Sequence, residues 1–204
     1  MDHNDWDARY AAADLVWSAE PNRWVEEEVA DLPPGRAVDL AAGEGRNSLW
    51  MAGLGWHVTT VDFSPVAIDK ARRLAETLVP EAAARLTFVV GDVRDELVEP
   101  AAFDLALLCY LQVPEADRRL ALARAATALR PGGCLLVVGH AAANVTDGTG
   151  GPQDPAVCYD PDQLVHELPA EPALELERAE LVRRPVEGAL RAALDTIVRA
   201  RRPA

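Results

Sequence analysis

Three aspartates stand where short apolar runs of the chain end. Asp39 ends the first run, Asp62 ends the second, and Asp92 follows the third. If the runs are parallel strands, their carboxyl ends meet at one edge of a sheet, where open α/β folds bind ligands. Carboxylates at that edge could accept both hydroxyls of a ribose, at Asp62, and the exocyclic amine of adenine, at Asp92. The spacing therefore predicts a site for a nucleoside-like ligand.

Two glycines after the first aspartate favour close approach of a ligand to the backbone. Gly43 and Gly45 permit positive φ angles. They could equally hold a dinucleotide pyrophosphate, but the GxGxxG pattern requires glycine where Ser48 stands, and Glu44 would repel a pyrophosphate. The GK[ST] ending of a phosphate-binding loop is also missing. A simpler role for Asp39, as a turn residue that caps the following helix, remains open.

A second group of residues could handle a proton and exclude water. His140 follows the fifth strand-like run and is the best-placed candidate base, because histidine changes its charge near neutral pH. Tyr110 follows the fourth run and is expected to line the reacting centre. Tyr10 and Trp17, near the N-terminus, are candidates for a lid, whereas Trp24 is expected to pack in the core. For each of these residues a purely structural role is the alternative.

Short apolar runs alternate with helical patterns along the chain. The runs predict strands at about 37–40, 57–61, 87–90, 103–109, 134–138 and 174–182, with 189–198 as a strand or a helix. Helices are expected at about 5–13, 22–30, 45–54, 65–78 and 115–129, and a short one after Pro161. The pattern predicts an α/β fold: a single doubly wound, mostly parallel seven-stranded sheet, with helices on both faces and a C-terminal antiparallel hairpin. The weakly patterned stretch 139–159 is expected to be a mobile active-site loop or partly disordered.

Composition narrows the class of protein. The chain has 204 residues, 50% of them hydrophobic and 26% charged, which is typical of one globular domain. Its formal net charge of −13 disfavours nucleic acid as a partner. No apolar stretch reaches transmembrane length, and no spacing of His, Cys and carboxylates suggests a metal site. The three cysteines form no disulfide framework, so we expect a cytoplasmic protein. We further expect a small-molecule substrate and a monomer or homodimer.

Five segments, in order across about residues 36–138, resemble the motifs of Rossmann-type (class I) S-adenosylmethionine-dependent methyltransferases. They are Val38-Asp39-Leu40-Ala41-Ala42-Gly43-Glu44-Gly45, Val61-Asp62-Phe63-Ser64, Gly91-Asp92-Val93-Arg94-Asp95, Phe103-Asp104-Leu105-Ala106-Leu107-Leu108-Cys109-Tyr110 and Leu129-Arg130-Pro131-Gly132-Gly133. One departure is that Ala41 replaces the first glycine of the usual GxGxG, which alanine tolerates if its φ stays negative. The chain is most similar to the small-molecule branch that includes tellurite-resistance and thiopurine-type enzymes. This likeness rests on Gly45-Arg46-Asn47-Ser48, on Gly55-Trp56-His57-Val58-Thr59-Thr60-Val61-Asp62, and on Trp6-Asp7-x-x-Tyr10 with the later Trp17.

The resemblance implies a cofactor, a site and a division of the chain. The cofactor is S-adenosylmethionine, which becomes S-adenosylhomocysteine. The implied cofactor-binding residues are Asp39, Ala41, Gly43, Gly45, Arg46, Asn47, Asp62, Phe63, Ser64, Asp92, Val93 and Cys109. Tyr110 and His140 are the implied catalytic residues, and they face the acceptor together with Tyr10 and Trp17. The expected parts of this single domain are an N-terminal helical lid (1–34), a cofactor-binding core (35–138), and a substrate loop with the C-terminal hairpin (139–204).

The expected reaction is methyl transfer to a small nucleophile by in-line displacement. A thiolate or chalcogen acceptor would need no base, whereas an oxygen or nitrogen on a small aromatic compound would arrive protonated. Two other functions remain open. One is a regulatory protein that binds the cofactor without catalysis, and the other is a nicotinamide-dependent reductase, which the missing GxGxxG disfavours.

Overall fold

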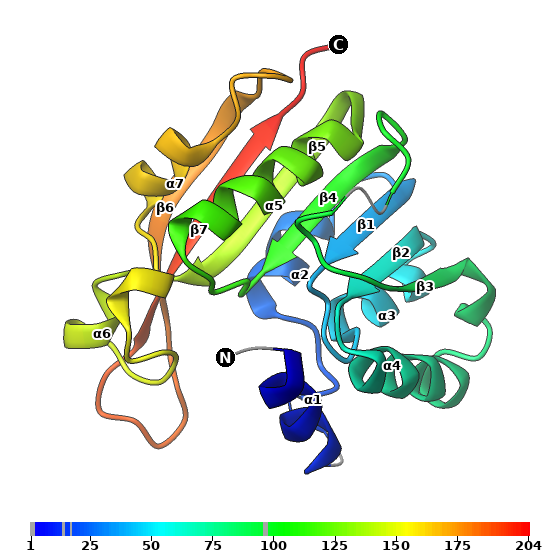
Figure 1. The fold of residues 1–204 in the computed structure, drawn as a ribbon, viewed down its shortest axis with the longest axis horizontal. Coiled ribbons are helices and arrows are strands. Elements are labelled where there is room, and N and C mark those ends of the chain that lie inside the picture. The colour runs from blue at the N-terminus through cyan, green and yellow to red at the C-terminus, as the bar shows by residue number, and fades with distance from the viewer. Residues whose placement is uncertain (1–2, 14, 17, 96–97) are drawn as a thin grey trace.

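The computed structural model describes residues 3–13, 15–16, 18–95 and 98–204 (Figure 1). Its α-helices are α1 (His3–Ala11), α2 (Arg23–Val29), α3 (Arg46–Gly53), α4 (Pro65–Leu78), α5 (Glu115–Ala128), α6 (Asn144–Asp147) and α7 (Pro161–Glu167). Its strands are β1 (Arg36–Leu40), β2 (His57–Asp62), β3 (Leu86–Val90), β4 (Phe103–Cys109), β5 (Leu129–His140), β6 (Glu175–Arg184) and β7 (Ala193–Arg201). Short 3₁₀ turns cover Ala83–Arg85 and Pro155–Val157.

The seven strands form one sheet in the order β3-β2-β1-β4-β5-β7-β6. The strands β1 to β5 pair in parallel, and β7 runs antiparallel to both of its neighbours. The chain moves outward from β1 to β3 on one side and then returns to β4 on the other. The boundary between β1 and β4 is thus the topological switch point at which open α/β sheets bind ligands. The predicted sheet and its C-terminal hairpin are confirmed.

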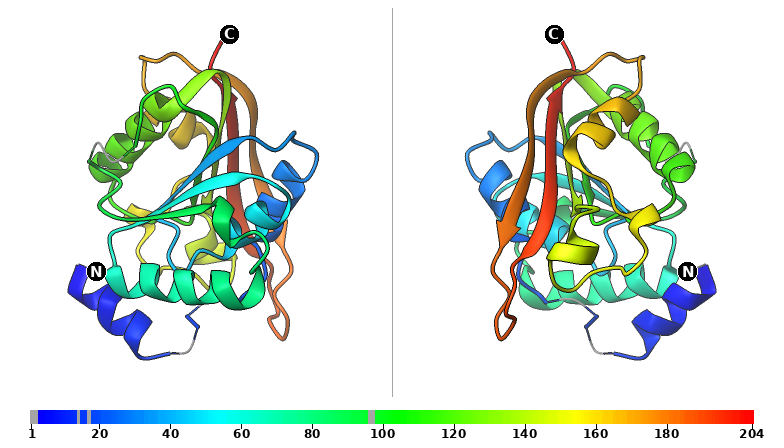
Figure 2. Two further views of the ribbon diagram at one scale, coloured as in Figure 1. Left: turned by 90° about the vertical axis from the view of Figure 1, so that its right-hand side faces the viewer. Right: turned by 90° about the vertical axis from the view of Figure 1, so that its left-hand side faces the viewer.

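Helices cover both faces of the sheet and form two cores. Side chains of α5 and α7 pack on one face, where Leu122 and Leu164 are fully buried. Side chains of α2 and α3 pack on the other, where Val25 and Met51 are fully buried. Figure 1 shows α5 in front of the sheet and α2 and α3 behind it, and the turned views of Figure 2 show the same three layers. The central strands are covered on both sides, which explains their nearly continuous apolar runs.

Local signals in the sequence fix the starts of two helices. The side chain of Asn22 accepts a hydrogen bond from the backbone N–H of Trp24 and caps α2. The hydroxyl of Ser64 accepts one from the N–H of Ala67 and caps α4, and Pro65 occupies the first helical position. The Asn22 cap fixes where α2 begins, and the Ser64 cap fixes where β2 gives way to α4.

Three boundaries differ from the sequence-based expectation. The strand β5 begins at Leu129, before the glycine pair, because Arg202 pairs through its backbone with both Gly132 and Gly133. The stretch 139–159 is not a plain loop, since it contains α6 and a 3₁₀ turn. The last segment is a strand, and it starts at Ala193.

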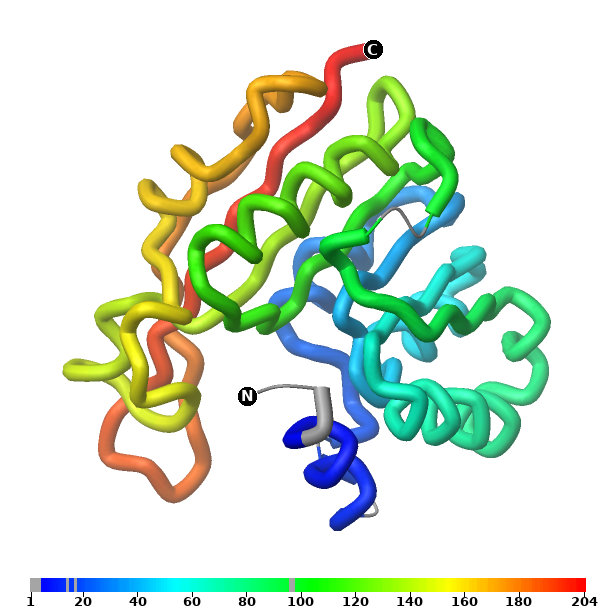
Figure 3. Tube along the Cα trace, in the orientation of Figure 1, coloured from blue at the N-terminus to red at the C-terminus, as the bar shows by residue number. Residues whose placement is uncertain are grey.

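Two segments project beyond the carboxyl ends of the parallel strands. These are α1 and the turn between β6 and β7, which the blue and orange parts of the tube show below the sheet (Figure 3). Both lie at the edge where the three aspartates end their strands. This edge therefore combines the switch point with two covering segments.

Candidate functional site

A cavity of about 1540 Å³ opens at the switch point. Its walls come from the carboxyl ends of β1, β2, β4 and β5, from the loop that follows β3, and from α1 and the end of β6. Asp39, Asp62 and Asp92 all line it, as the sequence predicted from their positions at strand ends. The cavity has room for a nucleoside-sized ligand together with a second small molecule.

Asp39 lies fully buried in the cavity wall and is only partly satisfied. Its Oδ2 accepts a hydrogen bond from the hydroxyl of Ser48 at 2.7 Å, whereas its Oδ1 has no hydrogen-bond partner among the described residues. Burial raises the pKa of Asp39 to about 7, although the Ser48 hydroxyl acts in the opposite direction. The site therefore contains a carboxyl group that a positively charged ligand group would stabilise in its ionised form.

The glycine loop and Asp62 support each other. The two oxygens of Asp62 accept backbone N–H groups, from Gly43 at 2.7 Å and from Ser64 at 2.9 Å. These bonds fix the carboxylate at the cavity wall. The carboxylate of Glu44 already has partners, because it pairs with Lys70 and accepts the N–H of Val16. Glu44 also lines the cavity, but its carboxylate is already paired, so the loop presents mainly backbone to a ligand.

Ala41 departs from the expected backbone geometry. Its φ is +58°, whereas the sequence-based expectation required a negative φ at this position. A left-handed conformation costs a residue with a Cβ about 1–2 kcal/mol relative to glycine. The first glycine of the GxGxG pattern would adopt this positive φ without strain. Ala41 adopts the same turn with strain.

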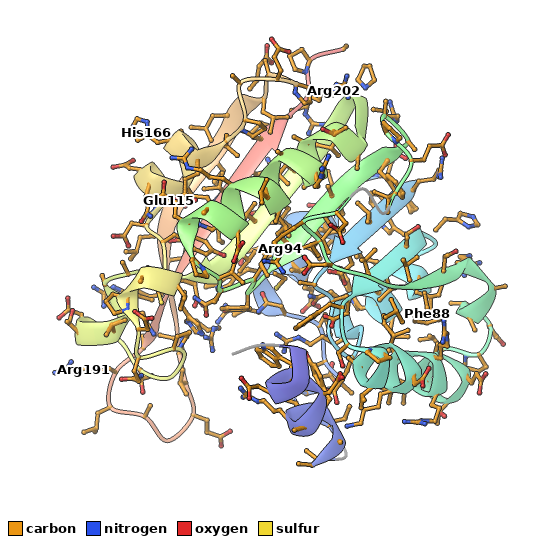
Figure 4. All side chains as sticks on the ribbon, in the orientation of Figure 1. Phe88, Arg94, Glu115, His166, Arg191 and Arg202 are labelled. Carbon is orange, nitrogen blue, oxygen red and sulfur yellow. The ribbon has the colours of Figure 1, made fainter. Side chains whose placement is uncertain are left out.

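Asp92 belongs to a charged cluster at the cavity rim. Its carboxylate pairs with Arg94 at 2.6 Å, and Arg94 also contacts Asp117 on α5 at 3.1 Å. Arg94 is labelled in Figure 4. The hydrogen bond from Arg94 lowers the pKa of Asp92 below its ordinary value. Val93 beside it is buried and lines the cavity. This arrangement gives the cavity one apolar surface and one anionic surface side by side.

Most of the other predicted cofactor residues also reach the cavity. Phe63, Arg46, Asn47 and Cys109 line it, whereas Gly45 and Ser64 are not among its lining residues in the described part of the chain. Burial raises the pKa of the Cys109 thiol to about 12, so this cysteine is not a thiolate nucleophile.

The N-terminal segment is tied to the cavity mouth. Tyr10 on α1 is buried, lines the cavity and stacks on Trp6 with ring centroids 5.5 Å apart. The ammonium of Lys70 on α4 bonds the backbone carbonyls of Tyr10 and Ala13. Trp17, predicted to be part of the same lid, lies outside the described residues. The segment that carries Tyr10 is therefore held beside the cavity by hydrogen bonds from Lys70.

His140 and Tyr110 meet at the opposite wall of the cavity. Their ring centroids are 4.7 Å apart, and both residues line the cavity. The φ of Tyr110 is +58°, an uncommon value that marks a constrained position. The hydroxyl of Tyr110 is buried and has no hydrogen-bond partner among the described residues, and burial raises its pKa. Two polar rings are thus presented together at one end of the cavity.

The sequence-based interpretation missed Asp195, which stands directly opposite His140 in the β5–β7 pairing. Its Oδ1 lies 3.1 Å from His140 Nδ1, and its Oδ2 accepts hydrogen bonds from Arg184 and Trp24. Burial opposes ionisation of this carboxylate, but the surrounding donors outweigh it and lower the pKa of Asp195 to about 2. Trp24, expected only to pack, has this second role. A signal existed: Asp195 is the one acid in the strand Ala193–Arg201, and it is flanked by apolar residues on its N-terminal side.

Metal clusters and membrane-spanning helices are both absent from the described ranges. Among these residues, no group of three or more His, Cys, Asp or Glu side chains could hold a metal ion. Likewise, none of the described helices is long and apolar enough to cross a membrane.

Comparison with known proteins identifies the central segment. Residues 37–133 match the family model described as "Methyltransferase domain". A ubiquinone biosynthesis O-methyltransferase of Xanthomonas campestris pv. campestris (strain B100) is 35% identical over 108 residues, which are 52% of this chain and 43% of that protein. The chain thus spans less than half the length of the curated relative it matches.

Solved structures share the fold over nearly the whole chain. A Burkholderia thailandensis 1,6-didemethyltoxoflavin-N1-methyltransferase, with its substrate and S-adenosylhomocysteine bound, is 22% identical, with a TM-score of 0.69 over 99% of this chain and 87% of that one. The [4+2]-cyclase SpnF is 16% identical, with a TM-score of 0.75 over 99% of this chain and 95% of that one. At these identities the likeness shows the fold alone, which can support different reactions.

Proposed function

We propose that this chain, whose residues 37–133 match a methyltransferase domain model, transfers a methyl group from S-adenosylmethionine to a small-molecule nucleophile. The observation that carries the proposal is the meeting of Asp39, Asp62 and Asp92 in one cavity at the switch point of the sheet. All three residues lie within the segment that matches the family.

The residues of the cavity fit this cofactor. The unpartnered Oδ1 of Asp39 is a buried acceptor that the ammonium of a methionine moiety would satisfy. Gly45 has a φ of +78°, and a Cβ added there would lie 3.1 Å from the Cβ of Ala71, so a side chain in the turn behind the loop would be strained and crowded. Both features are expected of a site that brings a charged amino-acid moiety against backbone.

Each moiety of the cofactor has proposed partners. Ribose hydroxyls would join the donors around the Asp62 carboxylate, and Asp92 with Val93 would receive the adenine. The carboxylate of the methionine moiety would lie against the backbone of the glycine loop at the start of α3, with Arg46 beside it. The Cys109 backbone and Phe63 would complete the wall.

The protein's own contribution to the reaction is to position the acceptor and exclude water. When bound, the cofactor supplies a methyl group on a sulfonium centre, which a nucleophile displaces in line. Tyr110 and His140 would orient the acceptor, and His140 would remove a proton where the acceptor carries one. Candidate acceptors are a thiol or chalcogen species, or an oxygen or nitrogen of a small aromatic compound. Thiol and chalcogen acceptors would fit kinship with the tellurite-resistance and thiopurine-type branch.

The N-terminal segment 1–34 is proposed to act as a lid. The bonds from Lys70 to the carbonyls of Tyr10 and Ala13 support this role, because they hold α1 at the cavity mouth. Deletion of residues 1–18 should lower turnover, and full activity of the shortened chain would contradict the lid. The cytoplasmic location and the choice between monomer and homodimer stay predictions.

Calorimetric titration of the purified protein tests the proposal. S-adenosylhomocysteine should bind saturably with micromolar affinity, and NADH, the control, should not bind. Binding of NADH alone would instead support the reductase alternative. Binding of S-adenosylhomocysteine without transfer to any acceptor would favour the regulatory alternative.

A further inference from the structure

We infer that Asp195 is the positioning residue for His140 and that the acceptor is a hydroxyl or N–H group that must lose a proton. The inference rests on the proposed function and narrows its substrate class. It depends on the geometry at the ends of β5, β6 and β7, which lies outside the segment that matches the methyltransferase family.

The contact between the two side chains is built by strand pairing. His140 and Asp195 are direct partners in the antiparallel register of β5 and β7, so their side chains leave the sheet on the same face. His140 Nδ1 and Asp195 Oδ1 are 3.1 Å apart, and neither atom has a hydrogen-bond partner elsewhere in the described part of the chain, so a small rotation of the ring would pair them. A carboxylate only accepts hydrogen bonds, so this contact selects the imidazole tautomer with its proton on Nδ1. Nε2 is then left with a lone pair that can take a proton.

The other carboxylate oxygen is held in place from two elements. Trp24 Nε1 on α2 donates to Asp195 Oδ2 at 2.9 Å, and Arg184 Nε at the end of β6 donates to the same atom at 2.8 Å. Asp195 is fully buried, whereas the His140 side chain is 12% exposed and lines the cavity. A buried carboxylate fixed by two donors, with its free oxygen turned toward a histidine at a cavity wall, orients that ring and balances the charge it gains.

Proton transfer in this arrangement balances without further reagents. His140 Nε2 takes the proton of the acceptor's O–H or N–H group as that atom's lone pair forms the bond to the methyl carbon. The bonding pair of the methyl–sulfur bond returns to sulfur, which loses its positive charge. The imidazolium beside Asp195 then releases its proton to solvent. A thiolate or selenide acceptor has no proton for His140 to remove. We therefore favour an acceptor with a protonated oxygen or nitrogen.

The first experiment reads the tautomer directly. The ¹⁵N spectrum of labelled protein, with the signal of His140 assigned among the four histidines by His140→Gln, should show the proton on Nδ1. In Asp195→Asn the population should move toward the Nε2–H form, and in the exposed control Asp69→Asn it should not. A proton on Nε2 in the unsubstituted protein, or identical spectra in all variants, would overturn the inference.

The second experiment reads the acceptor class. Transfer of labelled methyl is measured to 4-methylphenol, 4-methylaniline and 4-methylbenzenethiol, three acceptors of one shape. Asp195→Asn should lower kcat for the phenol or aniline about 100-fold and leave transfer to the thiol unchanged. The KM of the acceptor and the affinity for S-adenosylhomocysteine should stay within about twofold, because Asp195 touches neither. Transfer to the thiol alone would overturn the acceptor class. If none of the three is methylated, the role of Asp195 as positioning residue is decided by the ¹⁵N spectra of His140 alone.

Two neighbouring glycines, Gly150 and Gly151, allow the position of the His140 ring to be tested without substituting His140 or Asp195. A Cβ at Gly151 would lie 2.7 Å from His140 Nε2, whereas a Cβ at Gly150 would meet nothing within 4 Å. Their φ angles are similar, +74° and +69°, so alanine strains both backbones alike. Gly151→Ala should displace the His140 signal and lower turnover, while Gly150→Ala should do neither. Equal effects of the two would contradict the role of His140.

These outcomes separate the inference from the proposed function. If S-adenosylhomocysteine does not bind the unsubstituted protein, the proposed function fails whatever the tautomer is. If it binds, and Asp195→Asn binds it equally well but changes neither tautomer nor transfer to oxygen or nitrogen, only the inference fails.

Discussion

The β1–β3 side of the cavity and the β5–β7 side differ in how their polar atoms are satisfied. On the first side, both oxygens of Asp62 accept backbone N–H groups and Glu44 pairs with Lys70, so the buried carboxylate oxygen left without a described partner there is Asp39 Oδ1, at the end of β1. On the second, Tyr110 carries a buried hydroxyl without a described partner, and the facing atoms of His140 and Asp195 have only each other. A buried polar atom left unpaired in one place is costly, so it marks where a ligand or a transferred proton is expected. The first side is built to hold a ligand, and the second to act on one.

The largest expected effect breaks the second side and spares the first. His140→Ala should lower turnover of a protonated acceptor by about 100-fold, because general base catalysis is worth that much or more. The affinity for S-adenosylhomocysteine, measured by calorimetry, should change by less than about twofold. If turnover is unchanged, His140 is not the base.

Asp62→Ala breaks the first side and should spare the second. Affinity for S-adenosylhomocysteine should fall more than about tenfold, equivalent to about 1.4 kcal/mol, because the ribose loses its acceptor. The N–H groups of Gly43 and Ser64 also lose theirs, so the melting temperature should fall as well. Asp69→Ala, on the exposed face of α4, is the control. An unchanged affinity would reject the ribose role.

Asp39 lies on β1, which pairs with both β2 and β4, and the raised pKa of its carboxyl group predicts a pH dependence of ligand binding. Its pKa of about 7 in the folded protein lies above the ordinary value of 3.8, so the free protein holds this proton below about pH 7. Pairing with the ligand's ammonium requires the carboxylate, so binding releases the proton. Affinity for S-adenosylhomocysteine should therefore fall as the pH falls from 7 to 5, by at most about tenfold per unit. Asp39→Asn should remove the dependence, and an equal slope in both proteins would contradict it.

The smallest effect concerns the strained turn on the first side. Ala41→Gly should raise the free energy of unfolding by about 0.5–1 kcal/mol, because glycine relieves the positive φ but gains entropy in the unfolded chain. Thermal unfolding should show a rise of about 2–4 °C per kcal/mol. Ala42→Gly, at a neighbour whose φ is not positive, should lower stability instead. A fall in both variants would argue against strain at Ala41.

The contrast between the sides also decides what the sequence could predict. Asp39, Asp62 and Asp92 were found because each lies at or just after the end of its own strand, so a local pattern places it at the sheet edge. The contact of His140 with Asp195 needs the register of two strands far apart in the chain, and no local pattern contains it. The φ of Ala41 and the folded form of 139–159 likewise depend on tertiary packing. Local signals therefore gave the sheet and the ligand side, and missed half of the acceptor side.

The antiparallel register of β5 and β7 has a consequence for how damage to this protein would be detected. Side chains alternate between faces along a strand, so a shift of one residue would turn Asp195 away from His140 and into the opposite layer. The glycine loop and Asp62 lie on other strands and would be untouched. Such a misregistered molecule would still pass a ligand-binding assay while failing to turn over. A misaligned β5–β7 pair would thus be missed by a binding assay and detected only by an assay of turnover that requires proton removal.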